Sequence, residues 1–498
     1  MADPPSRLAA RELLDTVLDE GSWVGWDSAP VQPAPDGSPY AAELAAARER
    51  SGCDEAIITG EGRIHGRRVA LIAGEFRFLA GSIGAVAAER IVVAFERALR
   101  EELPVFAAPA SGGTRMQEGT PAFVGMVKIS AACARFKAAR LPYLVYLRHP
   151  TTGGVFASWG SLGQVTVAEP GAMIGFLGAR VYEALYGRPF PEGVQTAENL
   201  FEHGLIDAIL PVEALAETAD RALNVLMGGR EGPPDVPDVP TESLADSPAW
   251  DSIVRSRRAH RPGVRALLKL GATDVLPLHG TGSGEYDPGL LMALARFGGA
   301  PCIVIGQDRR GQTLDEPLSP KGLRVARRGM ALARELDLPL VSIIDTAGAA
   351  LSKEAEEGGM AGEIARCLAE LVTLEAPTLC VLLGQGTGGG ALALMPADRV
   401  ICAQHSWLSP LPPEGASAIL HRDTTHAPDL AAAQRVRSLD LLADGIVDRI
   451  VAEHPDAADE PQAFCLRMSQ AIQHELATLA RQEPAARLAA RLARYRRL

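Results

Sequence analysis

The sequence lacks the patterns that mark disulfide-rich, zinc-ribbon, nucleic-acid-binding and membrane-spanning proteins. Its seven cysteines are scattered over 498 residues, an odd number without a Cys-x-x-Cys pair, so neither a disulfide framework nor a zinc ribbon is expected. Lysine and arginine number 49 against 61 aspartates and glutamates, and the net charge of −12 gives no broad positive field for nucleic acid. No apolar run approaches ~18 residues, and the N-terminus has no apolar signal segment. We therefore expect a reduced, cytoplasmic protein that neither enters a membrane nor binds nucleic acid.

The usual motifs of side-chain catalysis are missing as well. The chain has no phosphate-binding G-x-x-x-x-G-K-[ST] loop and no H-E-x-x-H zinc motif, and Gly160-Ser161-Leu162-Gly163 lacks the spacing of a nucleophile elbow. His421 and His426 are five positions apart, which helical metal ligation does not favour, so we expect them at the surface and expect no metal. This scarcity of nucleophiles, bases and metal ligands favours chemistry in which backbone amides stabilise negative charge.

What the sequence does contain is an internal repeat. Leu-Pro, an apolar run and a glycine-rich loop occur at Pro104 and again at Pro339, and a second such segment begins at Pro142 and again at Pro377. The offset between the copies is 235 positions in both cases. Because two separate places share one register, the halves are predicted to be copies of one fold, each with glycine-rich strand-to-helix corners at the same depth.

Short apolar strands alternate with helical stretches in both halves, which predicts an α/β fold. The expected strands are residues 69–73, 105–108, 143–147 and 165–168 in the front half and 302–305, 340–344, 378–383 and 399–402 in the back half. The expected helices are residues 1–20, 85–100, 121–139, 321–336 and 360–374, with a tail helix over 461–498 interrupted at Pro484. Glycine, proline and acidic residues give 229–249 the composition of an exposed linker. We therefore divide the chain into an N-terminal domain (1–228), this linker and a C-terminal domain (250–498).

Four glycine-rich corners are the candidate sites. Each follows an apolar strand, and most lead into a helical segment whose first N–H groups are unpaired and carry the positive end of the helix dipole, which suits oxyanions. Any single Gly-Gly is more often a tight turn. Thr114 and Ala349 are 235 positions apart, however, and Gly154 and Gly390 are 236 apart, so both members of a possible two-amide cradle recur. The corners are residues 111–114, 152–155, 345–349 and 384–391.

The corner at Gly384-x-Gly386-x-x-Gly389 also fits the fingerprint of a dinucleotide-binding loop. That fingerprint needs an acidic residue about 20 positions further on to hold the ribose. Residues 405–410 contain none, so we expect no nucleotide at this loop.

At these residues the chain resembles the carboxyltransferases of biotin-dependent acyl-CoA carboxylases. The front half is similar to the β subunit of bacterial acetyl-CoA carboxylase carboxyltransferase, and the back half is similar to its α subunit. The resemblance covers roughly residues 57–212 and 250–452. The motifs that carry it are FLAGSIG (78–84), SGGTRMQE (111–118), LPY (141–143), PTTGGV (150–155), AEPGAMIGF (168–176), IDTAG (344–348), GGGALA (388–393) and PPEGAS (412–417).

The resemblance implies two tandem crotonase-like domains, with an active site where the front domain of one subunit meets the back domain of another. A homo-oligomer, a dimer or a hexamer, is therefore expected. The front half would hold the acyl-CoA thioester, and the back half would hold carboxybiotin on a separate biotin carboxyl carrier protein, with biotin carboxylase as a further partner. The implied function is carboxyl transfer from carboxybiotin to acetyl-CoA or propionyl-CoA, giving malonyl-CoA or methylmalonyl-CoA, as in fatty acid biosynthesis.

The family pattern also implies which residues act. Gly153 and Gly154 would bind the thioester oxygen, Gly390 and Ala391 would bind the ureido oxygen of biotin, and Thr114 and Ala349 complete the catalytic set. Carboxybiotin would release carbon dioxide, the ureido anion would remove the α-proton, and the enolate would attack carbon dioxide. Further substrate-binding candidates are Gly112, Gly113, Arg115, Gly348, Gly388 and Gly389, and Arg63, Arg77 and Arg90 are additional candidates for the CoA phosphates.

Two features depart from the family pattern. Bacterial β subunits usually begin with a zinc ribbon held by four cysteines, but only Cys53 lies in that region, so no zinc is expected. Ala347 stands where the family usually has proline in Asp-Thr-Pro-Gly. Two alternatives therefore stay open: biotin-independent decarboxylation of a malonyl thioester by the same cradles, and a non-catalytic scaffold subunit of a carboxylase complex.

Overall fold

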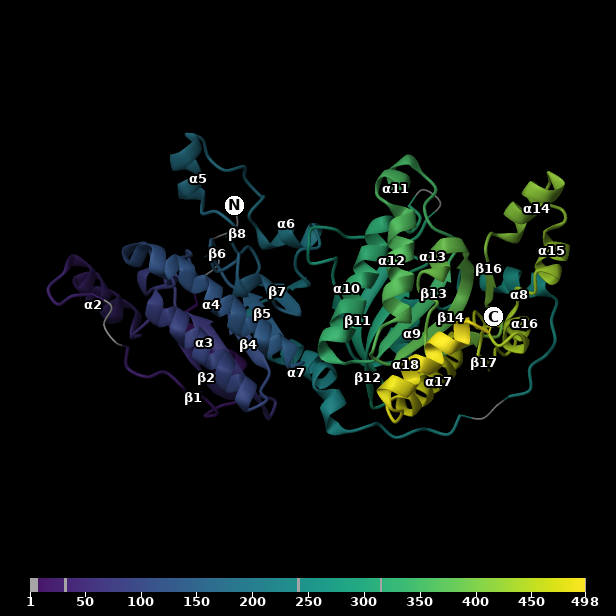
Figure 1. Ribbon diagram of the computed structural model, residues 1–498, viewed down its shortest axis with the longest axis horizontal. Helices are drawn as coiled ribbons and strands as arrows, with labels where there is room; N and C mark the ends of the chain where they lie inside the picture. Colours follow the sequence, from purple (N-terminus) through teal and green to yellow (C-terminus); the bar gives the residue numbers. More distant parts are fainter. Residues whose placement is uncertain (1–7, 31–33, 240–241, 314–315, 498) are drawn as a thin grey trace. The chain divides into compact units, whose positions relative to one another are not determined.

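The chain folds into two compact units (Figure 1). A computed structural model describes residues 8–30, 34–239, 242–313 and 316–497. One unit comprises Met1–Leu223 with Gly282–Gly284, and the other comprises Asn224–Thr281 with Glu285–Leu498. We call them unit 1 and unit 2. Among the described residues, no helix has the length and apolar character needed to cross a membrane.

Unit 1 is built on a seven-stranded sheet in the order β1-β2-β3-β4-β5-β7-β9. β2 and β3 form an antiparallel hairpin, and β3, β4, β5, β7 and β9 run parallel. Every residue of β4 and β5 is buried, as expected for strands covered on both faces. The strands are β1 (Val24–Gly25), β2 (Ile57–Ile64), β3 (Arg67–Gly74), β4 (Val105–Ala108), β5 (Tyr143–Leu147), β7 (Val165–Ala168) and β9 (Ala208–Ile209), and β6 (Thr151–Thr152) pairs with β8 (Ile174–Gly175) in a separate small sheet.

Two long helices cover one face of this sheet. α3 (Ala85–Arg100) packs against α4 (Gly119–Ala138) and against β2 and β3. Phe95 of α3 lies 5.5 Å from Phe136 and 5.3 Å from Tyr143 between ring centroids, at the centre of the core. The other helices are α1 (Ala10–Val17), α2 (Pro39–Ser51), α5 (Ala179–Tyr186), α6 (Ala197–Glu202) and α7 (Leu215–Leu226), whose last turn passes into unit 2. The 3₁₀ turns of unit 1 are η1 (Leu79–Gly81), η2 (Met116–Glu118), η3 (Trp159–Ser161) and η4 (Val212–Ala214), and η5 (Gly228–Glu231) belongs to unit 2.

Unit 2 repeats this plan in the order β10-β11-β12-β13-β14-β15-β17, with β16 paired to β14. α10 packs against β11 and β12, whereas α9 and α17 share a core with the alternate residues Ala293, Ala295 and Phe297 of β11, so helices cover both faces. The strands are β10 (Thr273–Leu278), β11 (Leu290–Phe297), β12 (Ala300–Gln307), β13 (Leu340–Thr346), β14 (Thr378–Thr387), β15 (Arg399–Ala403), β16 (Trp407–Ser409) and β17 (Arg449–Val451). The helices are α8 (Ala249–Ser256), α9 (Val264–Gly271), α10 (Pro320–Leu336), α11 (Lys353–Glu357), α12 (Met360–Val372), α13 (Gly388–Leu392), α14 (Pro413–His421), α15 (Ala427–Ala433), α16 (Ser438–Ala443), α17 (Pro461–Leu479) and α18 (Pro484–Tyr495).

The predicted repeat is present in the backbone pairing. Val105 pairs with Tyr143 between β4 and β5, and Leu340 pairs with Thr378 between β13 and β14. Isolated parallel bridges join Ile83 to Thr114 and Leu318 to Ala349. Each of the four residues in the two unit 2 contacts follows its unit 1 counterpart by 235 positions, and α3 and α10 likewise begin 235 positions apart. The two units are therefore copies of one fold in one register.

Some elements differ from the sequence-based expectation. The hairpin strands β2, β10 and β11 were not among the expected strands, whereas the tail forms two helices, α17 and α18, with Pro484 as the first residue of the second. Proline fits there because the first turn of a helix leaves its N–H groups unpaired. The expected N-terminal helix is confirmed only as α1, and residues 1–7 lie outside the described part of the chain.

The segment expected to be a linker lies along unit 2, and its backbone is bound there (Figure 1). Arg481 donates to the carbonyl of Pro234 at 2.6 Å, and His474 Nδ1 lies 2.8 Å from the carbonyl of Pro237. Arg437 donates to the carbonyl of Ser247 at 2.6 Å. We call the described residues of 232–248 the strap, and residues 240 and 241 lie outside the description.

Candidate active site

Two loops meet at the carboxyl end of the unit 1 sheet. One contains Ser111 and follows β4, and the other contains Thr152 and follows β5. Thr152 N donates to Ser111 O at 2.9 Å, and an added Cβ on Gly113 would lie 3.5 Å from the Cα of Gly153. Gly113 has φ of 108°, a conformation that side chains disfavour. The glycines therefore let two backbones pack directly against each other at the edge where parallel strands end.

Two amides of these loops are left without an acceptor. Thr114 N and Gly154 N donate no hydrogen bond within the described ranges, and both residues are half-buried. An added Cβ on Gly154 would lie 3.1 Å from Thr114 Oγ1, so the two residues face each other. A carbonyl oxygen placed there could accept from both N–H groups. The remaining glycine amides are already used: Gly112 N donates to Ala80 O (2.9 Å), Gly113 N to Ser111 Oγ (3.0 Å) and Gly153 N to Gly175 O (3.2 Å).

Unit 2 presents the same arrangement. Ala349 follows β13, and Gly390 lies in the first turn of α13. An added Cβ on Gly390 would lie 3.3 Å from Ala349 N. Gly388, Gly389 and Gly390 are the first three residues of α13, so their N–H groups have no acceptor inside the helix. Gly348 N donates to Thr346 Oγ1 at 3.1 Å, as Gly113 N does to Ser111 Oγ in unit 1.

We call Thr114 with Gly154 the unit 1 cradle, and Ala349 with Gly390 the unit 2 cradle. The structure thus brings four of the six expected catalytic residues together in two facing pairs. Gly153 adjoins the unit 1 cradle, but its amide is taken by Gly175 O. Ala391 is fully buried and is the fourth residue of α13, whose amide can reach the carbonyl of the helix cap, so it is not an unpaired donor.

Comparison with known proteins identifies the family. A family model described as the carboxyl transferase domain matches residues 4–489. The chain belongs to the carboxyl transferase family. A relative from Mycobacterium tuberculosis, named as a probable biotin-dependent acyl-coenzyme A carboxylase beta3 subunit, is 61% identical over 493 residues, which are 99% of each chain. A Parafrankia relative named as acetyl-coenzyme A carboxylase carboxyl transferase subunits beta/alpha is 38% identical, over 99% of this chain and 86% of its own.

Solved structures agree on the fold. Crystalline transcarboxylase 12S, described as a hexamer with methylmalonyl-coenzyme A bound, superposes with a TM-score of 0.73 at 19% identity, covering 95% of this chain and 90% of its own. A single-chain, multi-domain long-chain acyl-CoA carboxylase gives 0.72 at 21% identity, covering 93% of this chain and 45% of its own. The prediction of two tandem crotonase-like α/β domains is confirmed, as is the prediction that the chain is a carboxyltransferase of the biotin-dependent acyl-CoA carboxylases.

Arg115 of this carboxyltransferase does not face a substrate, contrary to the expectation that it meets a CoA phosphate. Its side chain is fully buried and is paired with the buried carboxylate of Glu55 and, at 3.3 Å, with Glu118. It also donates to the carbonyl of Ser82 at 2.7 Å. A phosphate would have to displace Glu55, so Arg115 instead holds the loop that carries Thr114.

The other arginine candidates differ in whether their side chains are already paired within the protein. Arg90 is buried and donates to both carboxylate oxygens of Asp54, at 2.9 and 2.7 Å. Arg63 lies at the β2–β3 turn, where its guanidinium donates to Gly66 O at 2.6 Å. Arg77 is exposed and lies just before η1, whose Ala80 accepts the amide of Gly112. Among these candidates, Arg77 combines an exposed side chain with a position beside the glycine loop.

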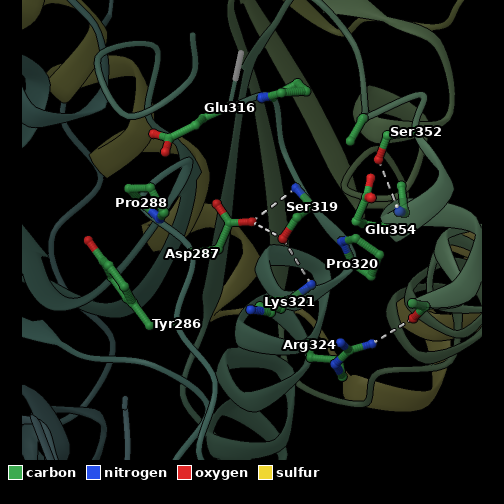
Figure 2. A pocket seen from close by; sticks show the side chains of 14 residues that line it. Tyr286, Asp287, Pro288, Glu316, Ser319, Pro320, Lys321, Arg324, Ser352 and Glu354 are labelled. Carbon is green, nitrogen blue, oxygen red and sulfur yellow. Dashed lines mark hydrogen bonds between the residues drawn. The ribbon is translucent and has the colours of Figure 1, made fainter. Parts of the chain in front are cut away.

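A pocket of about 430 Å³ adjoins the unit 2 loop at Ala350 (Figure 2). Its buried carboxylate, Asp287, accepts from the amides of Ser319 at 2.9 Å and Gly289 at 2.7 Å and from the Ser319 hydroxyl. Arg324 at the pocket wall donates to Glu285 at 2.8 Å. The Asp287 carboxylate therefore accepts hydrogen bonds from the protein itself and forms part of the pocket wall.

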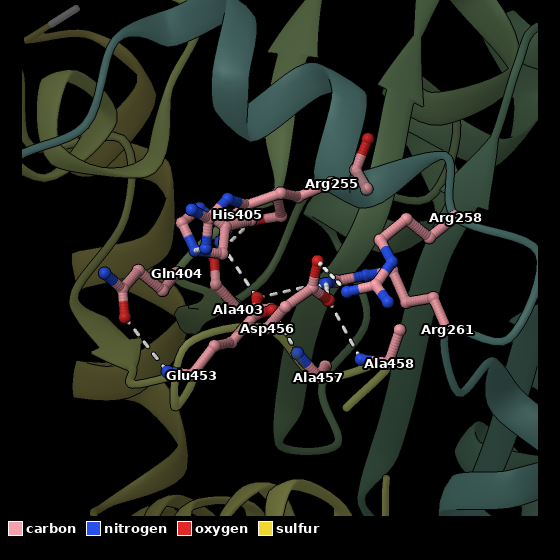
Figure 3. A network of polar contacts seen from close by, with 12 residues as sticks. Arg255, Arg258, Arg261, Ala403, Gln404, His405, Glu453, Asp456, Ala457 and Ala458 are labelled. Carbon is pink, nitrogen blue, oxygen red and sulfur yellow. Dashed lines mark hydrogen bonds and ion pairs between the residues drawn. The ribbon is translucent and has the colours of Figure 1, made fainter. Parts of the chain in front are cut away.

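Unit 2 also contains a buried ion-pair network, one member of which is bonded to β14 (Figure 3). Arg261 and Glu453 have fully buried side chains joined by hydrogen bonds of 2.6 and 2.7 Å. Arg261 also donates at 3.1 Å to the carbonyl of Leu383 in β14, the strand that leads to the cradle. Burial raises the pKa of Glu453, but the Arg261 guanidinium outweighs it and holds this pKa below its usual value. The network therefore holds the middle of β14, four residues before the strand ends at Thr387.

Replacing Glu453 with glutamine is expected to lower the free energy of unfolding by about 3–5 kcal/mol, because the buried Arg261 would lose its counter-charge. Since the folded pKa of Glu453 lies below its ordinary value of 4.5, the stabilisation is complete above that pH and is lost as the pH falls through the folded pKa. Urea unfolding of the wild type and of Glu453→Gln, at pH values above and below 4.5, measures the difference in the free energy of unfolding. Asp444→Asn, at an exposed pair with Arg435, is the control and should change little. Equal stability of wild type and Glu453→Gln at every pH would contradict this role.

Proposed function

We propose that this carboxyltransferase moves the carboxyl group of carboxybiotin, presented by a separate carrier protein, to the α-carbon of acetyl-CoA or propionyl-CoA. One observation supports this: two copies of one fold each present a facing pair of amides, with no hydrogen bond recorded from Thr114 N, Gly154 N or Ala349 N within the described residues. Two cradles suit a reaction in which negative charge builds on two carbonyl oxygens, one of the acceptor and one of the donor.

The cradles would divide the work between the substrates. In unit 1, Thr114 and Gly154 would bind the thioester oxygen and stabilise the enolate oxygen after the α-proton has left. In unit 2, Ala349 and Gly390 would bind the ureido oxygen of biotin, a planar carbonyl that fits two converging N–H donors. Carboxybiotin would supply the carboxyl group as carbon dioxide, and its freed ureido nitrogen would take the α-proton, so the chain itself would need no side-chain base. Each lost donor is expected to cost ~3–4 kcal/mol of transition-state stabilisation.

A second copy of the chain is proposed to cover the surface around both cradles. Met116 lies two residues after Thr114 and is 83% exposed, and Leu351 lies two residues after Ala349 and is 94% exposed. Further exposed apolar side chains are Phe123 and Val127 in unit 1 and Ile419 and Leu420 in unit 2. Exposed apolar side chains this close in sequence to both cradles are the support for an interface at this surface. Sedimentation of the pure protein as a monomer would contradict the oligomer.

The function is tested on the purified chain with malonyl-CoA or methylmalonyl-CoA and free biotin. We expect loss of the carboxyl group that depends on biotin and gives acetyl-CoA or propionyl-CoA. The ratio of kcat/KM for the two substrates measures the acyl preference. Equal rates with and without biotin would establish the decarboxylase alternative. No reaction in a protein that binds CoA normally would overturn the proposal.

Arg77 is proposed to bind a CoA phosphate. Replacing it with glutamine is expected to raise the KM for acyl-CoA about tenfold while kcat stays unchanged, because a charge-assisted hydrogen bond made equally to substrate and transition state contributes about 1.5–3 kcal/mol. Arg63→Gln, also at an arginine of unit 1 but on the β2–β3 turn, is the matched control and should keep the wild-type KM. Identical KM values for wild type and Arg77→Gln, or a change in kcat alone, would exclude this contact.

A further inference from the structure

One buried side chain connects the two segments that form the unit 2 cradle. Gln307 is the last residue of β12 and is fully buried. Its Nε2 donates to the carbonyl of Gly390 at 2.7 Å, and its Oε1 accepts from the amide of Asp345 at 3.1 Å. Asp345 is the second-to-last residue of β13, four positions before Ala349, so Gln307 links the strand that leads to Ala349 with Gly390 itself. If the side-chain amide were turned over, its NH₂ group would face the N–H of Asp345 and its oxygen would face the carbonyl of Gly390. Both contacts would be repulsive, so the orientation of the amide is fixed.

The helix α13, which contains Gly390, has little rigidity of its own. α13 is five residues long and begins with Gly388, Gly389 and Gly390. Glycine has more backbone freedom than any other residue, and a short isolated helix gains little from its own hydrogen bonds. A hydrogen bond from a buried side chain to Gly390 O therefore restricts the residue whose amide must point at the substrate.

Among the described residues of unit 1, the position equivalent to Gln307 is a glycine and carries no such bridge. β3 and β12 are both eight residues long, and the residue at the end of β3 is Gly74, which pairs with Ile57 as Gln307 pairs with Leu290. An added Cβ on Gly74 would lie 2.6 Å from the amide of Ala110, so backbone already fills the space that a side chain would need. In unit 1 the carbonyl of Gly154 accepts instead from the hydroxyl of Ser158 at 2.5 Å. A change at Gln307 therefore acts on one cradle.

We infer that Gln307 is a positioning residue that sets the distance between the Ala349 and Gly390 amides. The inference rests on the function proposed above, in which this cradle binds the ureido oxygen of biotin. Within the described part of the chain, the hydrogen bonds of the Gln307 side chain go to Asp345 and Gly390, so Gln307 would act through these two residues. Its loss should slow the biotin-dependent step and spare the binding of acyl-CoA in unit 1.

The test compares Gln307→Leu, which removes both hydrogen bonds at similar volume, with Gln307→Glu, which keeps the acceptor for Asp345 N. In Gln307→Glu a carboxylate oxygen faces the carbonyl of Gly390, so that contact becomes repulsive. Biotin-dependent decarboxylation of malonyl-CoA is measured, with rates expressed per molecule that binds malonyl-CoA. Both variants are expected to lose about 10- to 100-fold in kcat, because small misplacements of binding groups have effects of that size, while the KM for malonyl-CoA changes less than twofold.

Gln404→Leu is the matched control for the loss of a buried bridging glutamine in unit 2. Gln404 donates to Ala245 O at 3.4 Å and accepts from Glu453 N at 2.9 Å (Figure 3), away from the cradle residues. This control should lower the Tm and leave kcat unchanged. A wild-type kcat in both Gln307 variants, or an equal fall of kcat in Gln404→Leu, would overturn the inference. If the wild-type protein shows no biotin-dependent activity, the proposed function itself fails. If the wild type is active and the Gln307 variants match it, only the inference about Gln307 fails.

Discussion

Replacing Gly154 with alanine is expected to reduce kcat/KM for the biotin-dependent reaction by about 100- to 1000-fold, which is the effect of losing one oxyanion donor. The added methyl group would lie 3.1 Å from Thr114 Oγ1 and 3.5 Å from Met126 Cγ, between the two residues of the unit 1 cradle. The thioester oxygen could then no longer reach both amides. Gly154 is not among the glycines with positive φ, so alanine fits its backbone and the fold should persist. Steady-state decarboxylation of malonyl-CoA measures the loss, and circular dichroism checks the fold.

Gly125→Ala is the matched control in the same unit. Its methyl group would meet Ala88 Cβ at 3.6 Å, an ordinary contact, and alanine is the better helix former in α4. We expect wild-type kinetics and equal or higher stability. If Gly154→Ala retained activity within threefold of this control, Gly154 would not bind the reacting oxygen.

Replacing Gly390 with alanine should reduce the biotin-dependent rate by a similar factor of about 100 or more and leave malonyl-CoA binding intact. The added methyl group would lie 3.3 Å from Ala349 N and 3.4 Å from Ala349 Cβ, and so would occupy the unit 2 cradle. Because the thioester is assigned to the other unit, the Kd of malonyl-CoA should stay within twofold. Calorimetric titration and the decarboxylation assay together separate the two effects.

Gly299→Ala serves as the control in unit 2, since its methyl group would meet Pro234 Cβ at 3.7 Å, an ordinary distance outside the cradle. The two cradle variants also decide the scaffold alternative. A carboxylase complex that keeps full activity with either Gly154→Ala or Gly390→Ala would show that this chain supports catalysis carried out elsewhere. A fall in malonyl-CoA affinity in Gly390→Ala, with no change in rate, would contradict the assignment of the cradles.

The fold was predictable because the information for it is local and occurs twice. Strands such as 105–108 and 143–147 are short apolar runs after a proline, and the structure gives β4 and β5 at those residues. The equal offset between Pro104 and Pro339 predicted the register, which the pairing of Leu340 with Thr378 repeats. The hairpin strands were harder to predict, because β2 reads Ile-Ile-Thr-Gly-Glu-Gly-Arg-Ile and contains two glycines and two charged residues.

The sequence predicted which glycine-rich loops form the cradles, but not which of their amides are unpaired. The glycine pairs indicated where amides would be exposed, but which amide is unpaired depends on distant acceptors, such as Gly175 O for Gly153. Arg115 follows a glycine loop and therefore resembles a phosphate ligand, yet its partner Glu55 lies 60 positions earlier in the chain. A pairing at that separation has no local signature in one sequence.

Gln307 was missed for a related reason. The signal for it is weak: one uncharged polar residue ends a strand whose other seven residues include no side chain able to form a hydrogen bond apart from Cys302. Its partners, Asp345 and Gly390, lie 38 and 83 positions further on. A polar side chain at the end of a fully buried strand, at the level where the glycine corners begin, is the pattern that would identify such a residue in other chains.

The strap is held by its carbonyl groups, and this affects how its sequence can change over evolutionary time. Arg481, His474 and Gln404 contact the main-chain oxygens of Pro234, Pro237 and Ala245. Every amino acid supplies a carbonyl, and proline lacks only the N–H group, which these contacts do not use. Substitutions within the strap are therefore expected to keep these contacts as long as its backbone course is kept, whereas substitutions of Arg481, His474 or Gln404 would remove them.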